Sequence, residues 1–132
     1  MTQEQKELLL KDLCARLNCG VICTDNRHGD SRVFYIDVED ESVYYTDFDE
    51  YGLIENCRPY LRPMSTMSSK ERRELRQWGS LCMTENDVVE DVGVYGAIHS
   101  IPAIDWLNEH HFDYRGLIPM GLALPAPKDM YK

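Results

Sequence analysis

Apolar residues in the first 17 positions recur at the spacing of a helix. The i, i+3, i+4, i+7 pattern of a buried stripe is formed by Leu10, Leu13, Cys14 and Leu17. Thr2 and Gln5 have the spacing of a capping box, and Asn18 and Gly20 can end a helix through a left-handed cap. The pattern therefore predicts a helix over residues 2–17.

Between residues 20 and 57 the spacing of apolar residues shortens from that of a helix to the alternation of a strand, and short apolar runs alternate with turn residues. Strands are predicted at GVICTD (20–25), SRVFYIDVE (31–39), SVYYTDF (42–48) and LIENC (53–57), with turns at NRHGD, at residues 40 and 41, and at DEYG. In the longest strand, one face is expected to carry Val33, Tyr35 and Asp37, and the other Phe34, Ile36 and Val38. Turns this short predict an antiparallel meander of three to five strands. Such a meander can curl into a small SH3-like barrel, but the sequence leaves its closure open.

The segment RPYLRPMSTM (58–67) contains two prolines. Pro59 and Pro63 exclude a helix and a central strand here. We therefore expect an extended connector that lies over the core, with Tyr60 and Leu61 as its anchors.

A second helix is predicted to start at Ser68, with Glu71 as the other half of a capping box. Its apolar residues are mainly Leu75 and Trp78, so this helix is expected to be solvated or to face a partner. Residues 79–98 fit two interpretations, a helical turn capped by Thr84 or a strand over 92–98. The favoured one is a short helix followed by a loop or an edge strand.

The last helix is predicted to be capped by Ser100, with Pro102 in its first turn, where proline is tolerated. One face is expected to carry Ile101, Ile104, Leu107 and His111, and Gly116 lies beyond the helix end. The tail after it is apolar and rich in proline, and we expect it to pack on the domain as an extended strap. The fold class that results is α+β, with an N-terminal helix, a small antiparallel sheet and C-terminal helices, in one domain over 1–132.

Composition narrows the class of protein. The chain has 132 residues, of which 43% are hydrophobic and 28% charged, as in a globular domain. Apolar runs are too short for a transmembrane helix, and the acid-rich N-terminus does not fit a signal peptide. The number of cysteines is odd, and no pair has C-x-x-C spacing, so we expect reduced and mostly buried thiols. These features predict a cytoplasmic protein.

Charge is unevenly distributed along the chain. Residues 25–57 contain ten acids and two arginines, a net charge of −8, whereas residues 58–76 contain six bases and two acids, a net charge of +4. The whole chain carries −9. Such a protein should repel nucleic acid and anionic membranes, except at its one basic segment.

That basic segment is the best candidate for an interaction site. Its bases are Arg58, Arg62, Lys70, Arg72, Arg73 and Arg76. With Tyr60 and Trp78 nearby, these side chains can bind an acidic protein surface or stack on nucleic-acid bases. The alternative is intramolecular, because the same arginines can neutralise the acidic β-section, and Glu71 and Glu74 can form local pairs with them.

A second polar cluster surrounds the adjacent histidines His110 and His111, with His99 and Asp113. Adjacent positions on a helix point about 100° apart, so both histidines do not easily bind one metal. The order Glu-His-His also fails the H-E-x-x-H zinc pattern. We favour an ordinary helix end, where histidines interact with the dipole, and where Asp113 pairs with a histidine or with Arg115.

Two other groups of ligand-type residues are weaker candidates. Cys19, Cys23 and His28 match no strong zinc pattern, and no local feature supports a Cys–His nucleophilic pair. The acids around the strands are Asp37, Glu39, Asp40, Glu41, Asp47, Asp49 and Glu50. Their spacing begins like that of a calcium-binding loop, but the remaining ligands of such a loop are missing. These acids are interpreted as solvated turns, and no metal or cofactor is expected.

Three stretches resemble one family: KELLLKDLCARL near the start, RPYLRPMSTMSSKER in the middle, and IDWLNEHHFDYRGLIPMGLALPAPKDMY at the end. Together they are similar to a group of short proteins from gut-dwelling anaerobic bacteria and their phages or mobile elements. The resemblance covers somewhat under half of the chain and brings no catalytic residue with it. It implies a small cytoplasmic accessory protein.

The function predicted from the sequence is a non-enzymatic module that binds another protein or a second copy of itself. Its binding residues would be Arg58, Tyr60, Arg62, Arg72, Arg73, Arg76 and Trp78. The alternatives are a small hydrolase that uses His99, His110, His111 and Asp113, and a nucleic-acid-binding module that uses the basic segment. The hydrolase requires a deep pocket in which at least two of these side chains converge.

Overall fold

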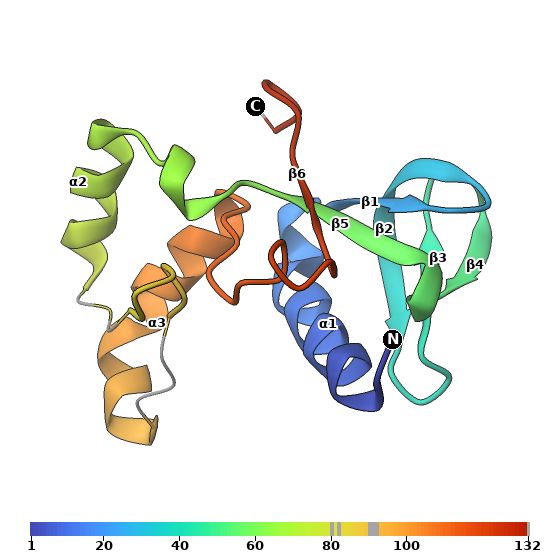
Figure 1. The fold of residues 1–132 in the computed structure, drawn as a ribbon, viewed down its shortest axis with the longest axis horizontal. Helices are drawn as coiled ribbons and strands as arrows, with labels where there is room; N and C mark the ends of the chain where they lie inside the picture. Colours follow the sequence, from blue (N-terminus) through green and yellow to red (C-terminus); the bar gives the residue numbers. More distant parts are fainter. Residues whose placement is uncertain (80, 82, 90–92, 132) are drawn as a thin grey trace.

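A computed structural model describes residues 1–79, 81, 83–89 and 93–131, and from 93 to 100 it describes the backbone alone. The fold is α+β, as the sequence predicts (Figure 1). Its helices and strands are, in chain order, α1 (Gln3–Arg16), β1 (Ile22–Asp25), β2 (Gly29–Asp37), β3 (Ser42–Tyr45), β4 (Glu50–Leu53), β5 (Cys57–Leu61), α2 (Ser69–Trp78), α3 (Gly93–Glu109) and β6 (Leu124–Pro125). Short 3₁₀ turns occupy η1 (Leu17–Cys19), η2 (Ile54–Asn56) and η3 (Met64–Thr66).

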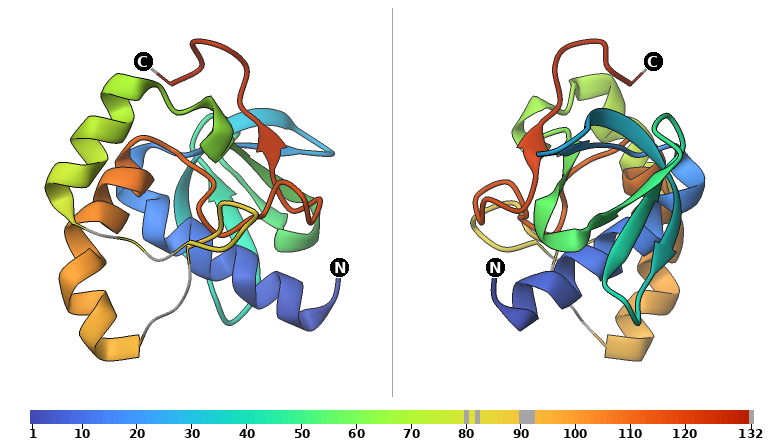
Figure 2. Two further views of the ribbon diagram at one scale, coloured as in Figure 1. Left: turned by 60° about the vertical axis from the view of Figure 1, so that its left-hand side comes forward. Right: turned by 90° about the vertical axis from the view of Figure 1, so that its right-hand side faces the viewer.

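The strands form one sheet in the order β4-β3-β2-β1-β5-β6. Neighbouring strands are antiparallel except for β5 and β6, which are parallel. The sheet curls, but it does not close into the SH3-like barrel that its short turns allow. Helix α1 packs against its inner face through Leu9, Leu10 and Leu13, which share a core with Val21, Val33 and Val43 (Figure 2).

The helix starts predicted at Thr2 and Ser68 are confirmed in detail. The Thr2 hydroxyl accepts a hydrogen bond from the Gln5 backbone, and the Gln5 side chain accepts one from the Thr2 backbone. Ser68 and Glu71 make the same reciprocal pair at the start of α2. Gly20 adopts the expected left-handed conformation, with φ of 71°.

The predicted stripe on α1 is only partly right. Leu10 and Leu13 are buried and Leu17 is half-buried, but Cys14 is exposed. The buried face is rotated toward Asp12 and Arg16, whose charges are neutralised within the fold. Hydrophobic periodicity cannot identify a buried ion pair, because it counts both residues as polar.

The expected faces of β2 are wrong after Val33. Val33 lies opposite Tyr45 and Tyr35 lies opposite Tyr44, so β2 contains one residue more than β3 in this interval. Such a bulge interrupts the alternation of side chains. As a result Phe34 and Tyr35 are both exposed, whereas Ile36 packs against the core.

The boundaries of β4 and β5 also differ from the prediction. DEYG is not a turn, because Glu50, Tyr51 and Gly52 pair with β3, and residues 54–56 form η2 instead of a strand. The expected connector begins as β5, in which Pro59 pairs with Cys23 of β1. Proline is tolerated here because β6 pairs only with Tyr60 and Leu61, which leaves Pro59 outside the part of β5 that has strands on both sides.

The last helix starts earlier than its capping signals indicate. Helix α3 runs from Gly93 to Glu109 with Pro102 inside it, so Ser100 is not its cap, and residues 93–98 form no strand. Interior proline costs about 3 kcal/mol in a free helix. Here the turns after Pro102 are anchored by tertiary packing, since Ala103, Trp106 and Leu107 are buried, whereas Ile101, expected on that face, is 52% exposed. Thr84 caps a turn over 84–87, which is not a helix, and residues 80, 82 and 90–92 lie outside the described residues.

A second apolar cluster joins α2 to α3. It contains Met64, Met67, Leu75, Ala103, Trp106, Leu107, Phe112 and Tyr114. The chain then crosses back to the first core, where Leu117, Leu122 and Ala123 are buried, before β6 pairs with β5. The tail therefore packs on the domain over these residues, as expected.

Candidate partner-binding site

The basic segment does not form one surface. Arg58 and Tyr60 lie on β5, where the Arg58 guanidinium donates to the carbonyls of Glu55 and Cys57. The Tyr60 hydroxyl donates to Asp30 at 3.1 Å. Both side chains thus make hydrogen bonds within or next to the sheet. In the sequence, η3 lies between them and the arginines of α2.

Arg62 is part of the framework of the protein. It forms a two-point ion pair with Glu71, with both N–O distances at 2.9 Å, and its guanidinium carbon lies 4.1 Å from the centre of the Phe112 ring. Burial alone would raise the pKa of Glu71, but hydrogen bonds from Arg62 and Ser68 outweigh it and hold the pKa below its usual value. Arg62 therefore makes contacts within the protein, as the intramolecular alternative predicts.

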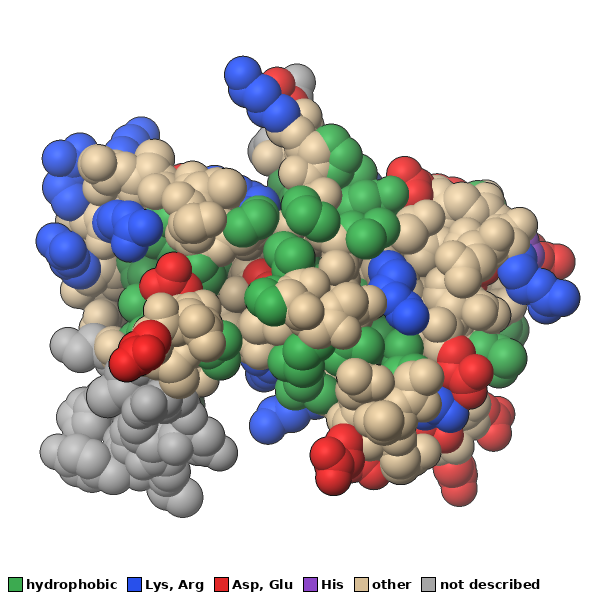
Figure 3. Space-filling model, in the orientation of Figure 1, with side chains coloured by type: hydrophobic (Ala, Val, Ile, Leu, Met, Phe, Trp, Pro, Cys, Tyr) green, Lys and Arg blue, Asp and Glu red, His purple; other side chains and the backbone are tan. Residues whose placement is uncertain are grey.

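Four bases on α2 point to solvent. Lys70, Arg72, Arg73 and Arg76 are exposed, and no ion pair is found for them among the described residues. Figure 3 shows the resulting group of Lys and Arg side chains at the left end of the molecule, over α2. Trp78 is 52% exposed, but it follows Arg76 by two residues, which is about 200° around a helix. The Trp78 ring therefore lies on the other flank of α2.

A pocket of about 340 Å³ opens beside two of these arginines. Its apolar walls are Met64, Met67, Leu75, Leu81 and Met83, and the polar side chains that line it are Arg72, Arg76 and Asp87. Three of the five apolar residues are methionines, whose flexible side chains adapt to different ligands. Sequence reasoning identified the arginines but not the pocket, because its walls come from η3, α2 and the segment after α2.

The adjacent histidines do not form a joint site. The Nδ1 atom of His110 lies 2.8 Å from the carbonyl of Trp106, and its ring stacks on the Trp106 ring. His111 has a left-handed φ of 62°, stacks on Tyr131 and is only 7% exposed. Burial lowers the pKa of His111 from 6.5 to about 4, and the charges of Arg16, His110 and Arg62 act in the same direction. His99 lies ten residues before the end of α3, about 15 Å along the helix axis.

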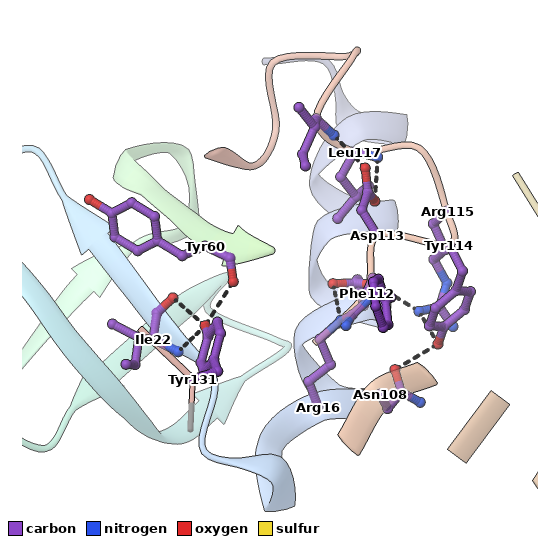
Figure 4. Close-up of polar contacts among 12 residues, drawn as sticks. Arg16, Ile22, Tyr60, Asn108, Phe112, Asp113, Tyr114, Arg115, Leu117 and Tyr131 are labelled. Carbon is purple, nitrogen blue, oxygen red and sulfur yellow. Dashed lines mark hydrogen bonds and ion pairs between the residues drawn. The ribbon is translucent and has the colours of Figure 1, made fainter. Parts of the chain in front are cut away.

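Asp113 pairs with backbone N–H groups, and not with a histidine or Arg115 as predicted. Its carboxylate accepts hydrogen bonds from the backbone N–H groups of Leu117 at 2.8 Å and Ile118 at 2.9 Å. Arg115 instead reaches Asp12 on α1 at 2.8 Å and donates to Tyr114 (Figure 4). The expected corner after the helix is therefore fixed, but by other partners.

The weaker candidates remain apart as well. His28 lies between the carboxylates of Asp25 and Glu50, 3.3 Å from Asp25 Oδ1. In the described ranges, no three histidine, cysteine, aspartate or glutamate side chains are grouped so that they could hold a metal ion. The acids of the β2–β3 and β3–β4 turns are exposed or half-buried.

Comparisons of the chain with models of protein families, with curated proteins and with solved structures give no match. Among the described residues, no helix is both long and apolar enough to cross a membrane.

Proposed function

We propose that the protein is a non-enzymatic binding module that takes an acidic segment of a partner protein at the pocket beside α2. The observation that carries the proposal is the position of Arg72 and Arg76 at a pocket lined by Met64, Met67, Leu75, Leu81 and Met83. An apolar side chain of the partner enters this pocket, and carboxylates on either side of it pair with the two arginines.

The physical chemistry of the pocket supports this mode of binding. The two guanidinium groups have no ion pair among the described residues, so both are available to pair with carboxylates of a partner, although Asp87 also lines the pocket. An aromatic or aliphatic anchor in an apolar pocket is the usual source of binding energy in small interfaces, and the surrounding charges set orientation and rate. Methionine walls favour a family of related segments over a single sequence.

The proposed setting is the cytoplasm, where the protein serves as a small accessory factor of gut anaerobes or of their phages and mobile elements. The resemblance of three stretches of the chain to such proteins supports this. The absence of a disulfide among Cys14, Cys19, Cys23 and Cys57 is compatible with a reducing compartment.

The two alternative functions have weaker support. A hydrolase needs its acid–base groups within hydrogen-bond reach of one substrate, but Asp113 caps the backbone of 117–118 and His110 stacks on Trp106. A nucleic acid could pair its phosphates with the four basic side chains of α2, but the net charge of −9 on the whole chain would repel it.

The experiment that tests the proposal selects binders from a displayed library of random peptides and measures their affinities by fluorescence polarisation. We expect enriched peptides to combine Asp or Glu with one bulky apolar residue. In the variant Arg72→Glu/Arg76→Glu, the affinity for these peptides should fall by roughly ten- to a hundredfold, since each reversed rim charge replaces attraction by repulsion. The matched control is Lys70→Glu/Arg73→Glu, which changes the net charge equally at two positions of α2 that do not line the pocket. Equal losses in both double variants, or peptides without acids, would overturn the proposal.

A further inference from the structure

The bulge in β2 directs two aromatic side chains to the same exposed face. Because Val33 pairs with Tyr45 and Tyr35 with Tyr44, the residue between them, Phe34, has no partner of its own on β3. Phe34 is 68% exposed and Tyr35 is 47% exposed. Without the bulge, strict alternation would direct one of the two rings to the opposite face.

These rings continue into a row across three strands. The Phe34 and Tyr44 rings meet edge to face with centroids 6.1 Å apart, and the Tyr44 and Tyr51 rings do so at 4.9 Å. Tyr51 on β4 is 59% exposed, and Leu53 next to it on the same face is 56% exposed. On the opposite face of the same strands Val33, Val43 and Tyr45 are buried in the core. The outer face of β2–β4 is thus an aromatic face in water, which in a soluble protein marks an interaction site.

The charge around the aromatic face is negative. Seven acids lie in the two turns that join its strands or at the strand ends beside them: Asp37, Glu39, Asp40, Glu41, Asp47, Asp49 and Glu50. Within residues 25–57 the only arginines or lysines are Arg27 and Arg32. Figure 3 shows acidic side chains at the lower right of the molecule, at the end opposite the basic group on α2.

We propose that the aromatic face of β2–β4 binds a segment rich in lysine and arginine from a partner protein. Aromatic rings attract cations over their faces, and the acids at both ends of the strands add long-range attraction for the same ligand. The negative charge disfavours phosphate backbones, which excludes nucleic acid as the occupant of this face. The site is separate from the α2 pocket and opposite in charge, since α2 and β4 lie at opposite ends of the molecule (Figure 1).

The test measures binding of a fluorescein-labelled peptide of alternating arginine and glycine by fluorescence polarisation in physiological salt. We expect saturable binding to the wild-type chain and at least a tenfold weaker affinity for Phe34→Leu/Tyr51→Leu. Leucine keeps an apolar, strand-compatible surface but removes the ring that a cation requires. The matched control is Trp78→Leu, which removes an exposed ring from α2 and should leave the affinity unchanged.

Three results would overturn the proposal. Equal affinity of the wild type and Phe34→Leu/Tyr51→Leu, with unchanged melting curves, would mean that the acids alone attract the peptide. Absence of saturable binding would mean that the face does not take this ligand. Sedimentation that reveals self-association of the protein, lost in Arg72→Glu/Arg73→Glu, would mean that a second copy occupies the face. Because the Arg–Gly peptide contains no acid, failure here leaves the proposed acidic-segment pocket untouched.

Discussion

The guanidinium of Arg16 donates hydrogen bonds to the carboxylate of Asp12 at 2.9 and 3.1 Å, and neither side chain is exposed to solvent. Arg16 also donates to the carbonyl of Phe112 at 2.6 Å, and Asp12 accepts a further bond from Arg115. This pair therefore ties α1 to the corner after α3, across 96 positions of sequence (Figure 4).

Replacement of Asp12 by alanine should strongly destabilise the protein. It leaves the buried Arg16 charge without its carboxylate, which typically costs about 3–5 kcal/mol. Urea unfolding followed by circular dichroism measures the change. Asp12→Leu/Arg16→Met, which removes both charges, should be less destabilised than Asp12→Ala. Glu55→Ala, which removes the carboxylate from an exposed pair with Lys6, is the control and should unfold like the wild type.

His111 makes stability depend on pH in a defined window. Its pKa is about 4 in the folded protein and near 6.5 when unfolded, so between these values the unfolded chain binds more protons. The free energy of unfolding should therefore fall as pH decreases from 6.5 to 4, by on the order of 2 kcal/mol from this residue. His111→Asn tolerates the left-handed backbone and should flatten the curve in that window. An equally steep curve in the variant, measured by urea unfolding at several pH values, would contradict this assignment.

Tyr131 fastens the tail to the sheet through its hydroxyl. That oxygen accepts a hydrogen bond from the Ile22 N–H at 2.9 Å and donates one to the Tyr60 carbonyl at 2.7 Å. Tyr131→Phe keeps the ring on His111 but leaves both backbone groups unpaired, and we expect a loss of about 1–3 kcal/mol. Tyr35→Phe, at an exposed tyrosine, is the matched control and should change the unfolding midpoint little. Similar midpoints for the two variants would show that the tail bonds contribute nothing.

Local signals predicted local structure well. Thr2 with Gln5 and Ser68 with Glu71 identify the starts of α1 and α2, because a capping box is complete within four residues. The β2 bulge, Pro59 inside β5 and the early start of α3 depend on distant partners, and no short pattern encodes them.

The candidate sites show the same division. Composition identified the arginines of α2, whereas the pocket beside them needed Met64 and Met83 brought together across the helix. Periodicity noted the aromatic residues of β2 but placed Phe34 and Tyr35 on opposite faces. The exposed row became visible only through the pairing of β2 with β3 and β4.

At Gly52 the backbone of β4 lies close to Asp25, the last residue of β1. A Cβ atom at position 52 would clash with Oδ2 of Asp25 and lie 2.7 Å from Cε2 of Tyr45, and both side chains are buried. Gly52→Ala should therefore cost about 1–3 kcal/mol, as overpacking of a core does. If the carboxylate is the main obstacle, Asp25→Ala makes room for the methyl group. The double variant Asp25→Ala/Gly52→Ala should then lose less stability than the two single losses added, because residues in contact are not independent. Urea unfolding of the four proteins completes the cycle, and strict additivity would show that Asp25 does not restrict position 52.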